Sequence, residues 1–277
     1  MKRKTFHIKM NETESLFSKL LNCSRAELYL NRDLVIDKSK ALLLSAALTK
    51  RIKGEPLAYI LGEDEFMGLK FKVNEDVLIP RPETEVLVET AIRQLSAFSR
   101  QLSAIKILEI GTGSGCIAIS LAKSLPRAEI TAIDISSKAL EVAKNNSLLH
   151  KAFVKFLQSD LFANPQLRIK NYDLIISNPP YIASPEMNSL PRELRCEPSI
   201  ALDGGFDGLN FYRRIIKQAF AYSKDGGLLI MEFGYGQRPA LENIFQESGE
   251  FEIMDIVKDY NNIERVIVAV PNKIWIN

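Results

Sequence analysis

Cysteine and histidine are scarce in this chain, and their positions exclude several kinds of site. The three cysteines, Cys23, Cys116 and Cys196, are odd in number and far apart, so we expect neither a disulfide framework nor a cysteine-paired zinc site. The two histidines, His7 and His150, have no Cys, His or carboxylate at ligand spacing. That isolation argues against a zinc site and against a histidine-based nucleophile. The sequence therefore predicts no metal centre.

Long apolar runs are also lacking. The longest candidate, Ala41–Leu48, is much shorter than the roughly 20 residues needed to cross a bilayer. Met1–Lys4 is basic, but the polar stretch Asn11–Ser15 stands where a secretory signal would be apolar. With 46% hydrophobic and 25% charged residues, the composition is that of a globular protein. We therefore expect no membrane partner and a cytoplasmic location.

The net charge of +2 is unevenly distributed along the 277 residues. Residues 1–60 contain 12 Lys and Arg against 6 Asp and Glu, which is +6, and the remainder carries −4. A basic segment of this kind can meet phosphate backbones or an acidic partner. The same charges, interleaved with Leu and Ile, also suit the solvent faces of small helices, and we favour that interpretation.

The chain divides into an all-helical part and an α/β part. From Leu16 to Leu48 the apolar residues recur at helical spacing, and Ser24 with Glu27 forms a capping box. Around Gly68 the pattern changes to the alternation of a β-hairpin. We predict a helical bundle over residues 1–62, a hairpin linker over 63–80 and an α/β domain over 81–277.

Short β-rich runs alternate with helical stretches after residue 104, and a helix begins before them with proline at position 82 in its first turn. The predicted strands cover residues 105–110, 130–133, 154–157, 172–177, 227–233, 251–257 and 266–270. Such alternation is typical of a twisted, mainly parallel sheet with helices on both faces. The fold class predicted for this part is therefore a Rossmann-like α/β fold.

A glycine loop follows the first of these strands, where open α/β sheets bind ligands. Gly111, Gly113 and Gly115 alternate in it, and Asp134 ends the next strand. Glycines let the backbone turn sharply and approach a ligand closely, and an acidic residue at this spacing is placed to accept the two hydroxyls of a ribose. The combination predicts a cofactor that contains adenosine.

The loop differs from the nicotinamide fingerprint. That pattern, G-x-G-x-x-G, needs a glycine at position 116, which is Cys116 in this chain. A carboxylate, Glu109, stands two residues before the first glycine, as expected where a cationic, amino-acid-bearing cofactor occupies the loop. S-adenosylmethionine fits this description.

A second motif follows the strand at residues 172–177. It reads Asn178, Pro179, Pro180, Tyr181. The prolines stiffen the backbone and carry no N–H, so this stretch presents acceptors, namely the Asn178 side-chain oxygen and the Pro179 carbonyl. Two hydrogen-bond acceptors of this kind suit an NH₂ group. The ring of Tyr181 would pack against a flat group that accepts the methyl.

Methyl transfer to a planar nitrogen explains why two such acceptors are needed. The lone pair of an amide or aromatic amino nitrogen is delocalised, so the nitrogen attacks poorly until both N–H bonds are held and the lone pair faces the electrophile. Positive charge develops on that nitrogen during transfer, which strengthens the two hydrogen bonds in the transition state. No strong base is required. The motif does not separate adenine, guanine and a glutamine amide as acceptors.

Together these residues resemble the release-factor glutamine N5-methyltransferases, the HemK/PrmC family. The likeness runs from about residue 55 to 270 and includes IPRPETE at residues 79–85 and EPSIALDGGFDGL at residues 197–209. A related enzyme that acts on a ribosomal-protein glutamine typically reads PRSP where this chain has PRPE at residues 80–83. That difference favours a release factor as the substrate.

The resemblance implies a helical N-terminal domain that docks a protein substrate, and a seven-stranded S-adenosylmethionine-dependent methyltransferase sheet whose last strand is antiparallel. The residues it implies for the methionine and ribose parts of the cofactor are Glu109, Gly111, Thr112, Gly113, Ser114, Gly115 and Asp134, with Asp160 and Leu161 at the adenine and Asn178 beside the cofactor. The residues it implies for the substrate are Asn178, Pro179, Pro180, Tyr181, Arg81 and Glu197, of which Asn178, Pro179 and Tyr181 would be catalytic.

The expected reaction is methyl transfer from S-adenosylmethionine to the glutamine of the GGQ motif of class I peptide chain release factors, with S-adenosylhomocysteine as product and no direct nucleic-acid substrate. Two other enzymes stay open, a ribosomal-protein glutamine methyltransferase and a nucleic-acid methyltransferase acting on adenine N6 or guanine N2. A non-catalytic cofactor-binding module is a further alternative.

Overall fold

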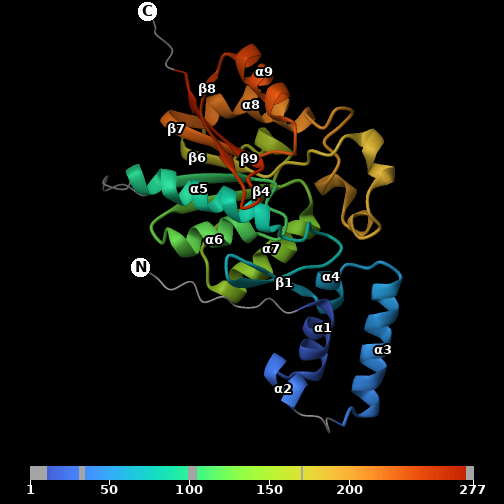
Figure 1. The fold of residues 1–277 in the computed structure, drawn as a ribbon. Coiled ribbons are helices and arrows are strands. Elements are labelled where there is room, and N and C mark those ends of the chain that lie inside the picture. Colours follow the sequence, from blue (N-terminus) through green and yellow to red (C-terminus); the bar gives the residue numbers. More distant parts are fainter. Residues whose placement is uncertain (1–10, 31–34, 99–104, 170, 273–277) are drawn as a thin grey trace, which may run out of the picture.

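The computed structural model describes residues 11–30, 35–98, 105–169 and 171–272. Figure 1 shows a central sheet between two layers of helices, with the N-terminal helices set to one side. The basic segment at residues 1–4 and the histidine at position 7 lie outside the described residues. No helix among the described residues is both long and apolar enough to cross a membrane.

The N-terminal region is helical, as predicted. Its helices are α1 (Glu12–Leu21), α2 (Arg25–Leu30), α3 (Lys38–Ile52) and α4 (Leu57–Leu61). The predicted capping box is present, since the Glu27 amide donates to Ser24 Oγ at 3.2 Å and the Ser24 amide donates to the Glu27 carboxylate at 2.7 Å. Asn11 and Glu14 form a second box at the start of α1, and Asp37 caps α3. Side-chain caps therefore define where three of these helices begin.

A two-stranded hairpin, β1 (Glu63–Phe66) and β2 (Leu69–Lys72), follows α4. Met67 and Gly68 form its turn with φ of 52° and 72°, the left-handed values that two-residue hairpin turns require. Phe66 and Phe71 are buried in the same hydrophobic cluster as one face of the main sheet. The hairpin is therefore anchored on the α/β part of the chain.

The main sheet has seven strands in the order β5-β4-β3-β6-β7-β9-β8. The strands are β3 (Lys106–Ile110), β4 (Glu129–Asp134), β5 (Val154–Gln158), β6 (Tyr172–Ser177), β7 (Ser223–Glu232), β8 (Phe251–Lys258) and β9 (Glu264–Pro271). β9 is antiparallel to both of its neighbours, whereas β3 to β7 pair in parallel. The α/β class and the antiparallel last strand are confirmed.

The strand predicted at 227–233 begins earlier, at Ser223. The intervening Lys-Asp-Gly sequence reads as a turn because Asp and Gly are poor strand formers, yet Ser223 pairs with Tyr172 across a register shift. Only the start of this strand was predicted wrongly.

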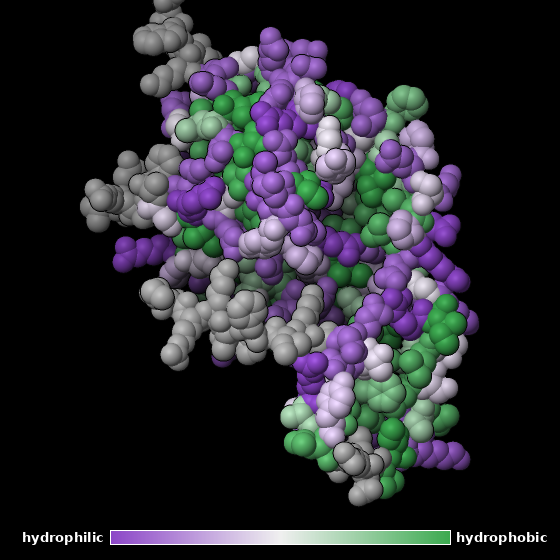
Figure 2. Space-filling model, in the orientation of Figure 1, coloured by the Kyte–Doolittle hydropathy of each residue, from purple (hydrophilic) through white to green (hydrophobic). Residues whose placement is uncertain are grey.

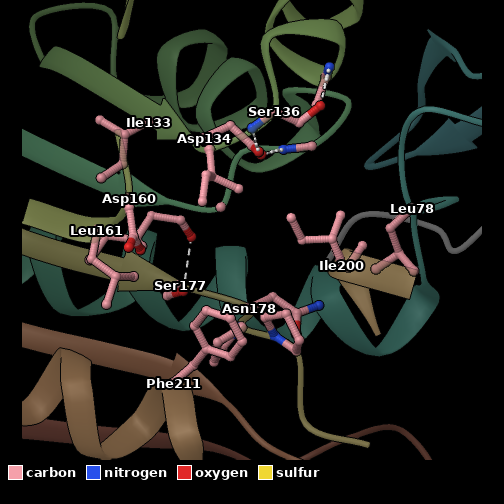
Figure 3. Close-up of a pocket in the computed structure, with 18 of the residues that line it drawn as sticks. Leu78, Ile133, Asp134, Ser136, Asp160, Leu161, Ser177, Asn178, Ile200 and Phe211 are labelled. Carbon is pink, nitrogen blue, oxygen red and sulfur yellow. Dashed lines mark hydrogen bonds between the residues drawn. The ribbon is translucent and has the colours of Figure 1, made fainter. Parts of the chain in front are cut away.

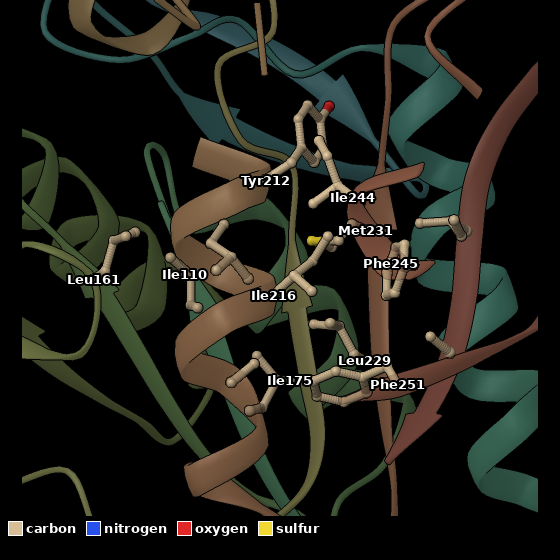
Figure 4. Packing of buried hydrophobic residues seen from close by; sticks show 14 of the residues in the cluster. Ile110, Leu161, Ile175, Tyr212, Ile216, Leu229, Met231, Ile244, Phe245 and Phe251 are labelled. Atoms are coloured by element: carbon tan, nitrogen blue, oxygen red, sulfur yellow. The ribbon is translucent and has the colours of Figure 1, made fainter. Parts of the chain in front are cut away.

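Helices cover both faces of the sheet. α5 (Pro82–Phe98), α6 (Cys116–Ser124) and α7 (Ser137–His150) lie on one face, and α8 (Asn210–Tyr222) and α9 (Arg238–Ser248) lie on the other. Short 3₁₀ turns occur at Leu161–Ala163, Ser184–Ser189, Leu194–Cys196 and Ser199–Ala201. Figure 4 shows Tyr212 and Ile216 of α8 packed over Ile175, Leu229 and Met231 of the sheet. This packing holds the strand ends rigidly enough to carry a site.

Candidate active site

The carboxyl ends of β5, β4, β3 and β6, which are neighbours in the sheet, surround a cavity of about 190 Å³ (Figure 3). The predicted site residues that line it are Gly111, Gly113, Asp134, Asp160, Leu161, Asn178, Pro179 and Pro180. The structure thus brings together the glycine loop, the acidic strand end and the proline motif. The other predicted residues are not among those that line it.

The first two glycines of the loop face open space. Gly111 and Gly113 have φ of 76° and 53°, and a Cβ on either one would meet no described atom within 4 Å. Their positive φ values favour glycine, and the open space above them leaves room for a ligand to approach the backbone. This cradle fits the amino-acid part of S-adenosylmethionine.

Asp134 joins this loop to the start of α7. One carboxylate oxygen accepts the Gly113 amide and the other accepts the Ser136 amide, each at 2.9 Å. Burial raises the pKa of Asp134, and these backbone hydrogen bonds oppose that shift. Each carboxylate oxygen has a second lone pair. The residue can therefore accept two further hydrogen bonds from the cavity, as the two hydroxyls of a ribose would require.

Glu109 lies beneath the loop and has no exposed surface. It accepts a hydrogen bond from Thr112 Oγ1 at 2.7 Å, and its Oε1 has no hydrogen-bond partner within the described part of the chain. Burial raises the pKa of its carboxyl to about 8. Glu109 therefore supports the loop through Thr112, and a nearby cation would stabilise its ionised form.

The rest of the loop is held by a residue that the sequence analysis missed. Asn146, on α7 and fully buried, donates to the Ser114 carbonyl at 2.8 Å and to the Lys72 carbonyl at 2.9 Å. Its Oδ1 accepts the Lys72 amide at 2.8 Å. Gly115 then leads into α6. One asparagine thus ties the cofactor loop to the hairpin.

Asp160 and Leu161 lie at one end of the cavity, after β5 (Figure 3). Both carboxylate oxygens of Asp160 accept from Arg214 of α8, at 2.8 and 2.9 Å. The guanidinium carbon of Arg214 lies 5.9 Å from the ring centre of Phe211, and both side chains line the cavity. Their positions depend on how α8 packs, and no local sequence signal marks them.

The proline motif packs against residues 197–209, the EPSIALDGGFDGL segment that follows it in the chain. Gly204 donates its amide to the Ile182 carbonyl at 2.7 Å, and the Ile182 amide donates to the Leu202 carbonyl at 3.0 Å. Gly208 has a φ of 74°, and a Cβ there would lie 2.4 Å from the Tyr181 carbonyl oxygen. Only glycine fits at that position. The EPSIALDGGFDGL segment therefore forms the bed on which the motif lies.

Tyr181, the last residue of the motif, is not among the residues that line the cavity. Its carbonyl accepts from Gln237 Nε2 at 2.9 Å, and its ring lies against Gly234. Burial raises the pKa of its hydroxyl to about 12. The structure thus places this ring next to the motif and beside β7.

Arg81 and Glu197, both predicted on the substrate side, form an ion pair with each other. Glu197 is buried and also accepts the Ile79 amide at 3.0 Å. The pair joins the segment before α5 to the segment after the proline motif. Leu78 and Ile200, each three residues from one partner of the pair, line the cavity at the end opposite Leu161 (Figure 3).

One wall of the cavity touches the N-terminal helices. Tyr59 of α4 donates its hydroxyl to the Val77 carbonyl at 2.6 Å, and Val77 lines the cavity. Lining residues outside the predicted set are Asp76, Val77, Leu78, Ile110, Ile133, Ile135, Ser136, Ala139, Ser159, Ser177, Pro198, Ile200, Ala201, Phe211, Arg214 and Ile215. Most of these are apolar, as expected for a small-molecule site.

Comparison with known families finds two matches along the chain. Residues 5–62 match the PrmC N-terminal domain, and residues 84–194 match the methyltransferase small domain.

Curated relatives cover almost the whole chain. The release factor glutamine methyltransferase of Geobacter sulfurreducens is 42% identical over 92% of this chain and 87% of its own length. The protein of the same name from Thermodesulfovibrio yellowstonii is 39% identical over 97% of this chain and 95% of its own length.

Among solved structures, the hMettl16 catalytic domain in complex with an RNA hairpin from the MAT2A 3′UTR has a TM-score of 0.57. The identity is 16%, over 88% of this chain and 87% of that chain. A likeness at that level of identity shows the shared fold alone, so the RNA in that complex says nothing about the acceptor used here.

Proposed function

Because this chain belongs to the family of release factor glutamine methyltransferases, we propose that it methylates the side-chain amide nitrogen of the glutamine in the GGQ motif of class I peptide chain release factors. The observation that carries the proposal is the placement of Asn178 and Pro179 at the same cavity as the glycine loop. An NH₂ acceptor and a methyl donor can therefore meet there. A cytoplasmic location follows from this substrate, since release factors act in translation.

S-adenosylmethionine, when bound, supplies a methyl carbon activated by the neighbouring sulfonium. We assign its amino-acid part to the loop of Gly111, Thr112, Gly113, Ser114 and Gly115. The two carboxylate oxygens of Asp134 accept the ribose hydroxyls, and Asp160 and Leu161 lie at the adenine. Glu109, ionised beneath the loop, balances positive charge. S-adenosylhomocysteine is the product, and no step is assigned to a metal ion.

Asn178 and Pro179 bind and orient the glutamine amide. The Asn178 Oδ1 and the Pro179 carbonyl accept the two N–H bonds of the glutamine amide, which turns the nitrogen lone pair toward the cofactor. Both hydrogen bonds strengthen as positive charge develops on that nitrogen, so they lower the barrier specifically. The methylated nitrogen then loses its proton to water. Pro180 keeps the motif rigid, and Tyr181 supports it from the β7 side.

The remaining residues place the substrate. The ion pair of Arg81 and Glu197 fixes the two segments that border the acceptor end of the cavity. We assign residues 1–62 to docking of the release factor, residues 63–80 to a linker and residues 81–277 to catalysis. The exposed apolar side chains of α3, described in the Discussion, support the docking assignment.

Methyl transfer from labelled cofactor tests the proposal. The protein is incubated with a class I release factor and, in parallel, with a release factor whose GGQ glutamine is replaced by alanine. We expect label on the first and none on the second. Equal labelling of both would refute the assignment of the acceptor. A ribosomal-protein fraction and ribosomal RNA, added separately, test the two alternative acceptors.

A further inference from the structure

Thr84 is a buried residue of the IPRPETE segment. It contacts Asn178, one of the two residues proposed to bind the substrate amide. It lies in the first turn of α5 and is 3% exposed. The Asn178 Nδ2 donates a hydrogen bond to its Oγ1 at 3.1 Å, across 94 positions of sequence. The sequence analysis gave Thr84 no role, and the scheme above does not use it.

A carboxylate stands behind this contact. Ser177 pairs with Met231 across β6 and β7, so Asn178 and Glu232 follow side by side at the same sheet edge. Both continue the face of Ile176 and Ile230, which pack in the cluster under α5, since alternate strand residues share a face. The helix α5, which carries Thr84, packs on that face, and the Thr84 hydroxyl oxygen accepts from Asn178.

Glu232 is 1% exposed, and its Oε2 has no hydrogen-bond partner among the residues that the structure describes. Burial raises the pKa of its carboxyl to about 7. Hydrogen bonding by the Thr84 hydroxyl and by the Asn178 amide opposes that shift. The buried carboxylate thus takes its side-chain hydrogen bonds from the two residues of the contact.

The donor and acceptor capacities of these groups determine the direction of the hydrogen bonds from Asn178 through Thr84 to Glu232. Above about pH 7, where Glu232 is ionised, its carboxylate only accepts, and a hydroxyl has a single hydrogen. When Thr84 gives that hydrogen to Glu232, its oxygen is left to accept from Asn178, so the nitrogen of the Asn178 amide faces Thr84. The amide oxygen then faces the other way, toward the cavity. A flipped amide would set Oδ1 against a hydroxyl whose hydrogen is already used, and would present N–H groups to the incoming NH₂.

We propose that Thr84, backed by Glu232, is a positioning residue that keeps the Asn178 amide turned with its Oδ1 toward the acceptor nitrogen. The inference rests on the proposed function, because an acceptor oxygen at this point matters only if an NH₂ group is the substrate. It also explains why the IPRPETE segment has a hydroxyl residue at the start of α5.

Thr84→Val tests the proposal, because valine has the shape of threonine without the hydroxyl. We expect kcat for the release factor to fall about 100-fold, as for other misplaced reacting groups, while KM and the cofactor Kd stay close to wild type. Thr84→Ser restores the hydroxyl and should recover most of kcat. Thr90→Val is the matched control, since Thr90 is buried on the same helix at 1% exposure and should leave kcat unchanged.

Wild-type kcat in Thr84→Val, or a loss that Thr84→Ser does not repair, would overturn the proposal. A neutron structure of the wild-type protein provides a test that does not depend on whether the variants fold. Deuterium on the Asn178 side-chain atom facing Thr84 is expected, and an oxygen there would overturn the inference. If the wild-type protein does not methylate release factors, the proposed function fails, and the neutron result still decides the orientation of the amide.

Discussion

Carboxylates at the sheet edge and in the N-terminal helices sit in very different surroundings. Glu109 and Glu232 are buried at the ends of β3 and β7, where burial raises the pKa of their carboxyls to about 8 and about 7. In the N-terminal helices, hydrogen bonds from Tyr29 and from the Asn11 amide lower the pKa of Glu14. The Ser39 hydroxyl and the Lys40 amide do the same for Asp37.

The difference shows what each region is built for. The carboxylates of the N-terminal helices satisfy amide groups at helix ends, so their charge stabilises the fold. Burial disfavours the charged form of the carboxylates at the sheet edge, and a positive charge nearby would restore it. Chemistry is therefore concentrated at the sheet edge.

Apolar side chains differ in exposure between the same two regions: they are buried in the central strands of the sheet, and several are exposed on the N-terminal helices. In the sheet, Ile175, Ile176 and Leu229 are completely buried. On α3, Leu42 and Leu43 are 63% and 56% exposed, and Figure 2 shows hydrophobic side chains gathered on the surface of the N-terminal helices. Exposed apolar patches of this kind mark interaction sites. The comparison therefore supports our proposal that the sheet edge carries the reaction and the N-terminal helices recognise the substrate.

The sharpest test of the reaction half is Asn178→Ala. Loss of the acceptor oxygen removes one of two hydrogen bonds that strengthen in the transition state, so kcat should fall about 100- to 1000-fold. Cofactor Kd, measured by calorimetry, should change much less than kcat, because Asn178 is only one of the residues that line the cofactor part of the cavity. Unchanged methyl transfer would mean that the Asn178 side chain does not hold the acceptor amide.

Asp134→Ala should produce the next largest effect, on cofactor binding. Hydrogen bonds to a charged group contribute about 1.5 to 3 kcal/mol each, so losing two of them raises Kd by at least about 100-fold. Asp134→Asn keeps one acceptor oxygen, so its cofactor Kd should lie between the values of wild type and Asp134→Ala. The far-ultraviolet circular dichroism of both variants should match wild type. An unchanged Kd in Asp134→Ala would contradict the assignment of the ribose.

Local motifs explain why much of this site was predictable from the sequence. The glycine loop, Asp134 and the proline motif each follow a strand directly. The carboxyl ends of parallel strands meet at one edge of the sheet, so strand positions and sheet type together predicted that these motifs would meet. The Ser24 capping box and the hairpin turn at Gly68 were predictable for the same reason, since both depend on neighbouring residues.

Residues that act across the fold were not predictable. Thr84 meets Asn178 across 94 positions, and Arg81 meets Glu197 across 116. Phe211 reaches the cavity through the packing of α8. No periodicity or spacing in the sequence encodes such contacts. The segments IPRPETE and EPSIALDGGFDGL were recognisable as signatures, but only the structure shows that they hold each other and the proline motif in place.

The recognition half is tested by charged substitutions on α3. Leu42→Glu with Leu43→Glu should raise KM for a release factor about tenfold, the effect of losing a modest interface anchor, and leave kcat and cofactor Kd unchanged. Leu148→Glu is the matched control, since Leu148 is an exposed leucine of α7 at 77% exposure. If the control raises KM equally, or the double variant does not raise it, the N-terminal helices do not dock the substrate through this face.

The smallest expected effect is on stability, and it follows from the sign of the pKa shifts. Glu232 has a higher pKa in the folded chain, about 7 against 4.5, so the folded protein holds more protons than the unfolded chain between these values. Its contribution to stability is therefore greatest below pH 4.5 and is lost as the pH rises through about 7, with a slope of up to about 1.4 kcal/mol per pH unit.

The capping carboxylates of the N-terminal helices behave oppositely, because their pKa values are lowered. Their contribution is present above the unfolded pKa and is lost as the pH falls through the folded value. Urea unfolding from pH 5 to pH 8.5 separates the two regions, since of these two sets of carboxylates only the buried ones titrate there. In Glu232→Gln, the decline of the unfolding free energy with rising pH should be less steep than in wild type, whereas Glu14→Gln should leave its slope unchanged. Parallel slopes in Glu232→Gln and wild type would show that Glu232 is not held in the protonated form by burial, and the contrast between the two regions would not hold.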